Sequence, residues 1–266
     1  MTALSERARR LRSRSFLIGL LTEVVIIAFA AIVYIVVREW TEGSPATAVE
    51  NARRLLEFEQ SIGIDFEYAL VQLSLDQPWL RTFVNWIYIW GHWPIIISVG
   101  AYLLTHHRER YIWLRNAMFV SGMIGFAFFA LVPMAPPRLS GLGYTDTIST
   151  WSSSYRVLQP PDYANLYAAM PSLHFGWDLL VGVALFSSTR LLPLRIFALT
   201  MPTLMAFAVI ATANHWVLDV VVGLVVVAAG AGISAAIAHY QPAEGARDAH
   251  VSRRDVGGPS AAKERC

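Results

Sequence analysis

Three short polar clusters in this sequence carry side chains that together can move a phosphoryl group. They are Met134-Ala-Pro-Pro-Arg138, Ala169-Met-Pro-Ser-Leu-His174 and Thr212-Ala-Asn-His-Trp-Val-Leu-Asp219. A cation, a helix end, a proton donor and an activated imidazole are the groups that this chemistry uses. Arg138 provides the cation, because its planar guanidinium matches the oxygens of a phosphate or a carboxylate.

His215 and Asp219 are the candidate imidazole and its partner. Residues four apart lie on one face of a helix, about 5–6 Å apart at Cβ, so the carboxylate can accept a hydrogen bond from one ring nitrogen. That bond fixes the tautomer and leaves the other nitrogen with a lone pair, as a nucleophile or a base. Taken alone, the pair is explained equally well by a structural hydrogen bond within a membrane helix.

The segment Pro171-Ser-Leu-His174 has the features of a helix start that binds an anion. Proline suits the first turn because it lacks the N–H group that would be unpaired there. The N–H groups of Ser172 and Leu173, the Ser172 hydroxyl and the positive helix end then form a candidate phosphate site. His174, one turn in, can donate a proton to a leaving oxygen. Taken alone, Pro-Ser is more simply a helix cap, and Arg138 an interfacial anchor.

Three further polar residues are candidates for supporting roles. Asp178 follows His174 by four residues and can orient it or neutralise a neighbour. His92 lies inside an apolar stretch, where a supporting role and a packed core histidine are equally open. Asn214 directly precedes His215. Spacing alone does not decide which histidine, 174 or 215, attacks phosphorus.

The elements around these clusters have the composition of membrane helices. Of the 266 residues, 55% are hydrophobic and 15% are charged, which is too little charge for the surface of a soluble domain. The net charge is +2, and the arginines flank long apolar blocks. This pattern favours membrane topology over nucleic-acid binding. The single cysteine, Cys266, excludes an intrachain disulfide and a cysteine-based metal site.

Six apolar blocks are each long enough to cross a hydrocarbon core of about 30 Å at about 1.5 Å per residue. We therefore predict an all-α polytopic bundle with about six transmembrane helices, at residues 16–37, 80–105, 111–134, 170–188, 194–212 and 215–238. The first block exceeds the apolar core of a cleavable signal peptide and indicates a membrane anchor.

Four regions follow from this topology. They are a basic cytoplasmic N-terminus (1–15), the first span plus an extracytoplasmic amphipathic helix that starts near Ser44-Pro45 (16–79), a five-helix catalytic core (80–238) and a disordered cytoplasmic tail (239–266). The helix start at Ser44-Pro45 rests on the preference for proline in the first turn, and the surface location on its helical spacing of apolar residues.

The basic residues predict the orientation. In a six-span topology, fifteen of the 21 Lys and Arg residues flank the side shared by the two termini, and six flank the other side. This bias places both termini in the cytoplasm of a cell-membrane protein and all three polar clusters at the extracytoplasmic face. A compact bundle can bring the clusters together at one depth. Ionisable groups there are costly, which indicates function when all three clusters are taken jointly.

Pro171-Ser-Leu-His174 and His215-x-x-x-Asp219 resemble the second and third signature motifs of the type 2 phosphatidic acid phosphatase (lipid phosphate phosphatase) superfamily. The stretch Tyr167-Ala-Ala-Met-Pro-Ser-Leu-His174 is most similar to the inositol phosphorylceramide synthase-like branch and its bacterial relatives. The resemblance spans about residues 80–235, and its specificity lies in the combination of motifs.

This resemblance implies a role for each matching residue. His215 would attack phosphorus and become phosphorylated, with Asp219 as its orienting carboxylate. His174 would protonate the leaving alcohol and then activate the incoming water or alcohol. Arg138 would bind the phosphate, and no metal or other cofactor is expected.

Four positions depart from the phosphatase pattern: Leu131 replaces a lysine, Leu139 a proline, Leu173 the glycine of Pro-Ser-Gly-His, and Ala208-Val209 the Ser-Arg pair of the third motif. The second phosphate-binding arginine is therefore missing, which favours the synthase-like branch over a simple phosphatidate phosphatase. Arg81 and Arg156 are the candidates for supplying the missing charge.

The sequence predicts a membrane phosphatase or phosphotransferase that acts on a phospholipid or polyprenyl phosphate at the extracytoplasmic face. Water or an alcohol such as a polyol would accept the phosphoryl group, and the loop 139–168 would help to form the headgroup pocket. An inactive family member with a binding role is a weaker alternative.

Two rival functions remain. A proton-coupled or ion-coupled transporter needs polar residues through the membrane depth, whereas the stretch after Asp219 is Val-Val-Val-Gly-Leu-Val-Val-Val. An intramembrane serine hydrolase would use Ser172, but that residue has the position of a helix cap, and no Gly-x-Ser-x-Gly turn surrounds it.

Overall fold

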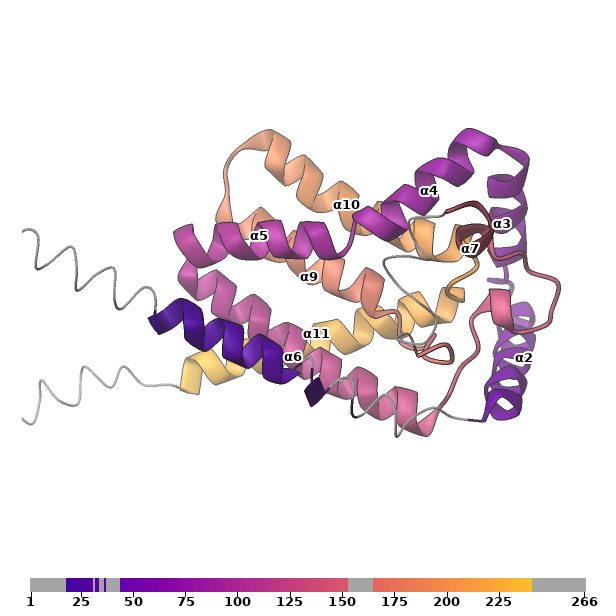
Figure 1. The fold of residues 1–266 in the computed structure, drawn as a ribbon, viewed down its shortest axis with the longest axis horizontal. Coiled ribbons are helices and arrows are strands. Elements are labelled where there is room, and N and C mark those ends of the chain that lie inside the picture. The colour runs from indigo at the N-terminus through magenta and orange to yellow at the C-terminus, as the bar shows by residue number, and fades with distance from the viewer. Residues whose placement is uncertain (1–17, 31, 34–35, 37–43, 153–164, 241–266) are drawn as a thin grey trace, which may run out of the picture.

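The computed structural model describes residues 18–30, 32–33, 36, 44–152 and 165–240. These residues form helices and connecting loops, with an isolated parallel β-bridge between Met134 and Ala168. A helix at Ile18–Ala30 comes first. The labelled elements in Figure 1 are α2 (Pro45–Ile62), α3 (Glu67–Asp76), α4 (Pro78–Trp90), α5 (Trp93–His106), α6 (Arg108–Leu131), α7 (Thr147–Trp151), α9 (Leu173–Ser188), α10 (Leu192–Ala211) and α11 (Val217–Tyr240).

The predicted all-α membrane bundle is confirmed, and the lengths of its helices refine the expected number of spans. By length and composition, three described helices can cross a membrane: α6, α10 and α11. The pair α4 and α5 passes the same test as one bent span. The helix at Ile18–Ala30 and α9 are apolar but shorter, at the places of the expected first and fourth spans.

The bend between α4 and α5 measures 45° and lies at Gly91-His92. Pro94 is in the first turn of α5 and has no N–H to donate to the carbonyl of Trp90, four residues earlier, so a continuous helix is not favoured there. The break turns the His92 side chain into the interior, where it is 3% exposed. An apolar span thereby carries a buried ionisable group.

Helix packing brings three distant chain segments to one end of the bundle. α6 packs along α11, and α9 packs along α10. Where α11 passes the start of α9, a Cβ on Gly223 would lie 2.6 Å from the carbonyl oxygen of Ser172, so only glycine permits this approach. The loop after α6, the start of α9 and the start of α11 consequently converge.

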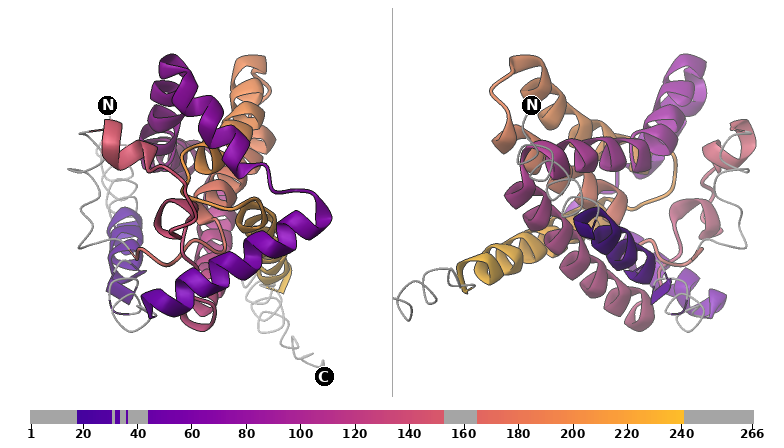
Figure 2. Two further views of the ribbon diagram at one scale, coloured as in Figure 1. Left: turned by 90° about the vertical axis from the view of Figure 1, so that its right-hand side faces the viewer. Right: turned by 60° about the vertical axis from the view of Figure 1, so that its left-hand side comes forward.

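The hairpin of α2 and α3 covers that same end. α2 lies across the ends of the long helices (Figures 1 and 2) and starts with Pro45 after Ser44, as the sequence indicates. Its fully buried residues Ala48 and Ala52 join a cluster with Met134, Ala169 and Trp216. The location of this helix along a membrane surface remains a prediction.

Several expectations concern residues outside the described ranges. These are the basic N-terminus (1–15), most of the tail (from residue 241), the middle of the loop 139–168, and Arg156. Arg81 is described, and its guanidinium lies over the Trp151 ring at 4.4 Å from the ring centre.

Candidate active site at the end of the bundle

The three polar clusters predicted to converge are hydrogen-bonded to one another through their main chains. Ala169 is the junction: its N–H donates to the Met134 carbonyl at 3.2 Å, and its own carbonyl accepts from the His215 ring at 2.8 Å. The Arg138 N–H donates to the Ala213 carbonyl at 3.0 Å, and the Trp216 indole donates to the Ala135 carbonyl at 2.9 Å. Segments separated by up to about 80 residues therefore form one rigid unit.

The hydrogen bonds of His215 determine which ring nitrogen is free. Its Nδ1 lies 2.8 Å from the Ala169 carbonyl oxygen and 3.3 Å from Asp219 Oδ2. A carbonyl oxygen can only accept, so Nδ1 carries the proton and Nε2 holds the lone pair. The side chain is 5% exposed. The main-chain carbonyl is the nearer partner, and Asp219 is the second one.

His174 faces His215 across the site. The centres of the two rings are 6.1 Å apart. An attacking nitrogen approaches phosphorus to about 3–3.5 Å, and a proton donor lies about 2.6–3.2 Å from the leaving oxygen. The two imidazoles are thus close enough that one bound phosphate ester could contact both. The His174 ring makes no hydrogen bond to another described residue, and Tyr88 stacks on it at 4.8 Å.

His92 and Asp178 form a second histidine–carboxylate pair beside His174. His92 Nδ1 lies 2.8 Å from Asp178 Oδ1, and both side chains are buried. The His92 ring is 4.5 Å from the His174 ring, centre to centre. Asp178 thus pairs with His92, which decides between the two roles that the sequence left open. His92 lies beside the His174 ring, and its supporting role in a reaction stays a prediction.

Arg138 is held in place by two acceptors. Its Nε donates to Asn214 Oδ1 at 3.0 Å, and its Nη1 lies 3.2 Å from Asp146 Oδ2. The Asn214 amide donates in turn to the Thr212 carbonyl and hydroxyl. Nη2 makes no hydrogen bond to a described residue, so this nitrogen remains for an anion. Asn214, which directly precedes His215, thereby links the Arg138 guanidinium to the segment that carries His215.

The start of α9 differs in two respects from the predicted anion site. Leu173 begins the helix, Ser172 precedes it as the cap residue, and Pro171 lies before the cap rather than in the first turn. The Ser172 N–H donates to the main-chain carbonyl of Asp219 at 2.9 Å, so it is not a free donor. Its hydroxyl is fully buried without a described partner. The Leu173 N–H likewise has no acceptor among the described residues, so its binding of a phosphate stays a prediction.

The N-terminal turn of α11 is occupied by carboxylates. Asp219 Oδ2 accepts from the Trp216 N–H at 2.9 Å, as an acidic residue at the third helical position does in a capping box. Glu67 Oε1 accepts from the Val217 N–H and Glu59 Oε1 from the Leu218 N–H, both at 2.8 Å. These amides are consequently unavailable to a phosphate.

Sequence reasoning missed four residues of this site. Asp146 and Tyr88 contact Arg138 and His174, and Glu59 and Glu67 contact α11. Asp146 is also the cap of α7, where its Oδ1 accepts from the Ser149 N–H. Two glutamates inside otherwise mixed helices carried no motif. Only their position in the helices could have indicated them, because a helix that packs over the end of the bundle turns some polar side chains inward.

Burial raises the pKa of the Glu59 carboxyl from 4.5 to about 9, and the nearby Glu67 and Asp219 side chains add to the rise. The folded state therefore holds a proton that the unfolded state releases above about pH 4.5. Stability from this group is complete below that pH and is lost as the pH rises toward about 9.

We expect the free energy of unfolding of the wild type in detergent to fall between pH 5 and pH 9 by up to about 1.4 kcal/mol per pH unit from this group. Glu59→Gln, which cannot ionise, should flatten that slope. Unfolding midpoints measured at pH 5, 7 and 9 check this, with Glu57→Gln on the exposed face of α2 as control. Identical slopes in wild type and Glu59→Gln would contradict it.

Among the described residues, no three His, Cys, Asp or Glu side chains are grouped so that they could hold a metal ion. The ionisable groups around His215 are two histidine–carboxylate pairs, the ring of His174 and the Arg138–Asp146 ion pair. Together with the helices that are long enough to cross a bilayer, they define the class: a helical membrane protein with a histidine site at one end of its bundle.

A scan against protein families matches the PAP2 superfamily over residues 53–233, and the chain belongs to that superfamily. The match begins inside α2, so it includes the later part of α2 and all of α3. No curated protein and no solved structure matches the chain. Members of this superfamily are membrane phosphatases and phosphotransferases, which supports a phosphatase-type function in general.

Proposed function

We propose that this protein is a lipid phosphate phosphatase or phosphotransferase that works through a phosphorylated His215. The observation that carries the proposal is the donation of the Nδ1 proton to the Ala169 carbonyl, which leaves the Nε2 lone pair free opposite His174. A neutral imidazole with a fixed tautomer is a competent nucleophile.

In the first step, the Nε2 lone pair attacks phosphorus and the bond from phosphorus to the alcohol oxygen breaks. The protonated His174 gives its proton to that oxygen, so the alcohol leaves neutral. Arg138 Nη2 and the N–H at the start of α9 bind the phosphoryl oxygens. The new positive charge on His215 is stabilised by the nearby Asp219 carboxylate.

In the second step, His174, now neutral, takes a proton from water or from an acceptor alcohol. The resulting oxygen nucleophile attacks phosphorus and releases Nε2. With water the product is inorganic phosphate, and with a polyol it is a new phosphate ester. One intermediate therefore serves a phosphatase and a transferase.

The synthase-like branch is supported by the two positions that replace the second arginine. Ala208 and Val209 are fully buried in an apolar cluster, and the Val209 carbonyl accepts from the N–H groups of Asn214 and His215. These positions support the loop of the nucleophile and carry no charge toward a phosphate. Arg138 alone would then provide the guanidinium in the described part of the site.

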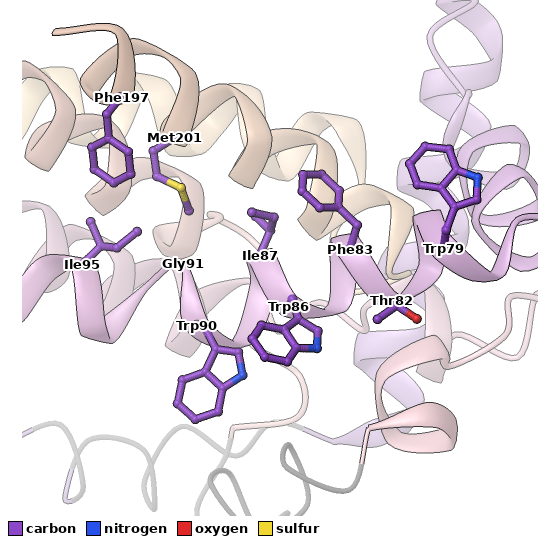
Figure 3. Close-up of a pocket in the computed structure, with 10 residues that line it drawn as sticks. All are labelled: Trp79, Thr82, Phe83, Trp86, Ile87, Trp90, Gly91, Ile95, Phe197 and Met201. Atoms are coloured by element: carbon purple, nitrogen blue, oxygen red, sulfur yellow. The ribbon is translucent and has the colours of Figure 1, made fainter. Parts of the chain in front are cut away.

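A lipid substrate is supported by an apolar groove of about 540 Å³ between α4 and α10 (Figure 3). Phe83 and Ile87 on α4 and Met201 on α10 line it. Gly91, which precedes His92, is among the residues that line it, and a Cβ at Gly91 would meet the Met201 side chain at 2.2 Å. A hydrocarbon chain in this groove would leave its phosphate near the opposite side of the same helix break.

The positive-inside bias supports a site at the extracytoplasmic face of the cell membrane.

The test of the whole proposal is incubation of the purified protein with radiolabelled phosphatidate, polyprenyl phosphate and sphingolipid phosphate in EDTA. We expect metal-independent release of phosphate, or its transfer to an added polyol, and acid-labile, base-stable label on the protein. Turnover without any labelled protein in rapid-quench samples would overturn the histidine intermediate.

His92, paired with Asp178, lies beside His174, where the pair can supply protons to it. We therefore expect His92→Phe to lower kcat by about tenfold. A loss of this size corresponds to about 1.4 kcal/mol, close to the net value of one hydrogen bond. The pH dependence of kcat for the wild type and His92→Phe checks it. His106→Phe, at the exposed end of α5, is the control, and equal pH profiles for the two variants would contradict the role of His92.

A further inference from the structure

The N-terminal turn of α11 is held by carboxylates from two helices that lie far away in the sequence. Glu59 on α2 and Glu67 on α3 accept from the N–H groups of Leu218 and Val217, across 159 and 150 residues. Neither side chain is exposed to solvent. The hairpin also contacts the bundle through Asn51 and Ser74, whose side chains donate to the carbonyls of Pro133 and Ala211.

Burial of two glutamates is costly unless their polar atoms are satisfied. Here one oxygen of each carboxyl group takes a helix N–H, and the other oxygen has no described hydrogen-bond donor. A cap of this kind requires only one small polar side chain in most helices. Two buried glutamates at successive amides therefore exceed what a helix start needs.

These contacts bear on where a phosphate can bind. A free helix N-terminus attracts phosphate through its N–H groups and its positive dipole end. In α11 the amides of the cap and of the first two helical residues are taken by Asp219, Glu67 and Glu59. With these N–H groups occupied, the start of α11 offers them to no phosphate. The phosphate is directed to Arg138 and to the start of α9, on the other side of the His215 ring.

The same bonds set the position of the nucleophile. His215 precedes the bonded residue Val217 by two positions, and its own N–H is fixed to the Val209 carbonyl at 3.0 Å. The ring must satisfy the Ala169 carbonyl while keeping Nε2 toward His174. A shift of the first turn of α11 by about 1 Å changes this alignment, and misplacements of that size cost up to about 100-fold in rate.

We propose that Glu59 and Glu67 are positioning residues for the reaction: they fix the first turn of α11 so that His215 attacks a phosphate held elsewhere. The α2–α3 hairpin is then part of the catalytic unit and not only a cover for the bundle end. This inference rests on the proposed function, because it assigns a role in the attack by His215.

The test compares Glu67→Ala with Glu67→Gln in the full-length protein. The glutamine keeps a carbonyl oxygen for the Val217 N–H, whereas alanine removes it. We expect Glu67→Ala to slow formation of the phosphorylated protein by at least tenfold with KM changed less than threefold. Glu67→Gln should stay within threefold of the wild type in both values. Glu57→Ala, on the exposed face of α2, is the matched control.

A second variant removes the same bond from the other partner. Val217→Pro deletes the N–H at the first helical position, where proline is well tolerated, so the start of α11 is retained. It should slow phosphorylation like Glu67→Ala, and the double variant should be no slower than either single one, because the two changes remove one shared bond. This route keeps the inference testable if Glu67→Ala does not fold.

The possible results separate the inference from the proposed function. No phosphorylated histidine in the wild type would remove the proposed function itself. A phosphorylated wild type with Glu67→Ala and Val217→Pro at control rates would overturn the positioning role alone. Additive losses in the double variant, or a loss that appears only in KM, would also overturn it. Slow phosphorylation in both single variants and recovery in Glu67→Gln support it.

Discussion

His215→Ala should abolish both the acid-labile label on the protein and at least about 99.99% of phosphate release from a lipid phosphate. Loss of a covalent nucleophile has cost about 10⁴-fold or more in other hydrolases. Here no neighbour can replace the imidazole. The ring centre of His174 lies 6.1 Å from that of His215, and in the proposed mechanism His174 acts on the side of the leaving group. The measurement is rapid-quench labelling together with steady-state phosphate release.

The matched control for this loss is His239→Ala. His239 is an exposed histidine at the far end of the same helix, so its replacement removes the same side chain from α11 without touching the site. Its labelling and turnover should equal those of the wild type. Label retained by His215→Ala, with an unfolding midpoint near that of the wild type, would show that another residue is the nucleophile.

His174→Ala should lower turnover of an alkyl phosphate by about 10²–10⁴-fold, the usual contribution of a general acid. An alkoxide is a poor leaving group, so the first step depends on the proton from His174. A nitrophenyl phosphate diester or monoester leaves as a stable anion and does not need that proton. With this substrate the variant should still become phosphorylated at a rate within about tenfold of the wild type.

The second step then gives the decisive observation. Without His174 no base activates water, so the phosphorylated protein should accumulate after a burst of one nitrophenolate per molecule. Stopped-flow absorbance gives the burst, and quenched labelling gives the trapped fraction. An equal loss with both substrates, and no accumulation, would exclude His174 from protonating the leaving group. Addition of imidazole offers a control, since a free base should partly restore release.

These two experiments also distinguish the enzyme from its rivals. A transporter would not be labelled at His215, and the apolar run after Asp219 in α11 offers no ionisable groups for a path through the membrane. A serine hydrolase would depend on Ser172, whose hydroxyl is fully buried. Phosphorylated histidine is incompatible with both.

Local sequence patterns were sufficient for the long apolar helices and for most candidate residues, but not for α3, α7 or the break between α4 and α5. Apolar blocks long enough to cross a bilayer predicted the helices, since burying backbone groups in hydrocarbon requires them to be helical. Proline after Ser44 predicted the start of α2. The motif residues Arg138, His174 and His215 were identifiable because their chemistry is carried by side-chain type and spacing. The PAP2 family match agrees with the resemblance seen in those motifs.

Only the tertiary structure decided how these residues are paired. Spacing of four residues suggested the same geometry for His174–Asp178 and His215–Asp219, yet Asp178 bonds to His92, 86 residues away. The helix break at Gly91 turns that histidine inward, and the sequence does not specify by how much. The Ser172 N–H appeared free for an anion and is instead used by the Asp219 carbonyl.

The physical reason is the range of the interactions. Helix formation, capping preference and hydrophobic periodicity act over a few residues, so the sequence by itself determined the helical membrane class and the inventory of reactive groups. Hydrogen bonds between groups 46 to 159 residues apart depend on how close-packed helices approach and cross, which no local pattern encodes. The tertiary structure therefore decided which acceptor orients His215 and which carboxylates, Glu59 and Glu67, hold the start of its helix.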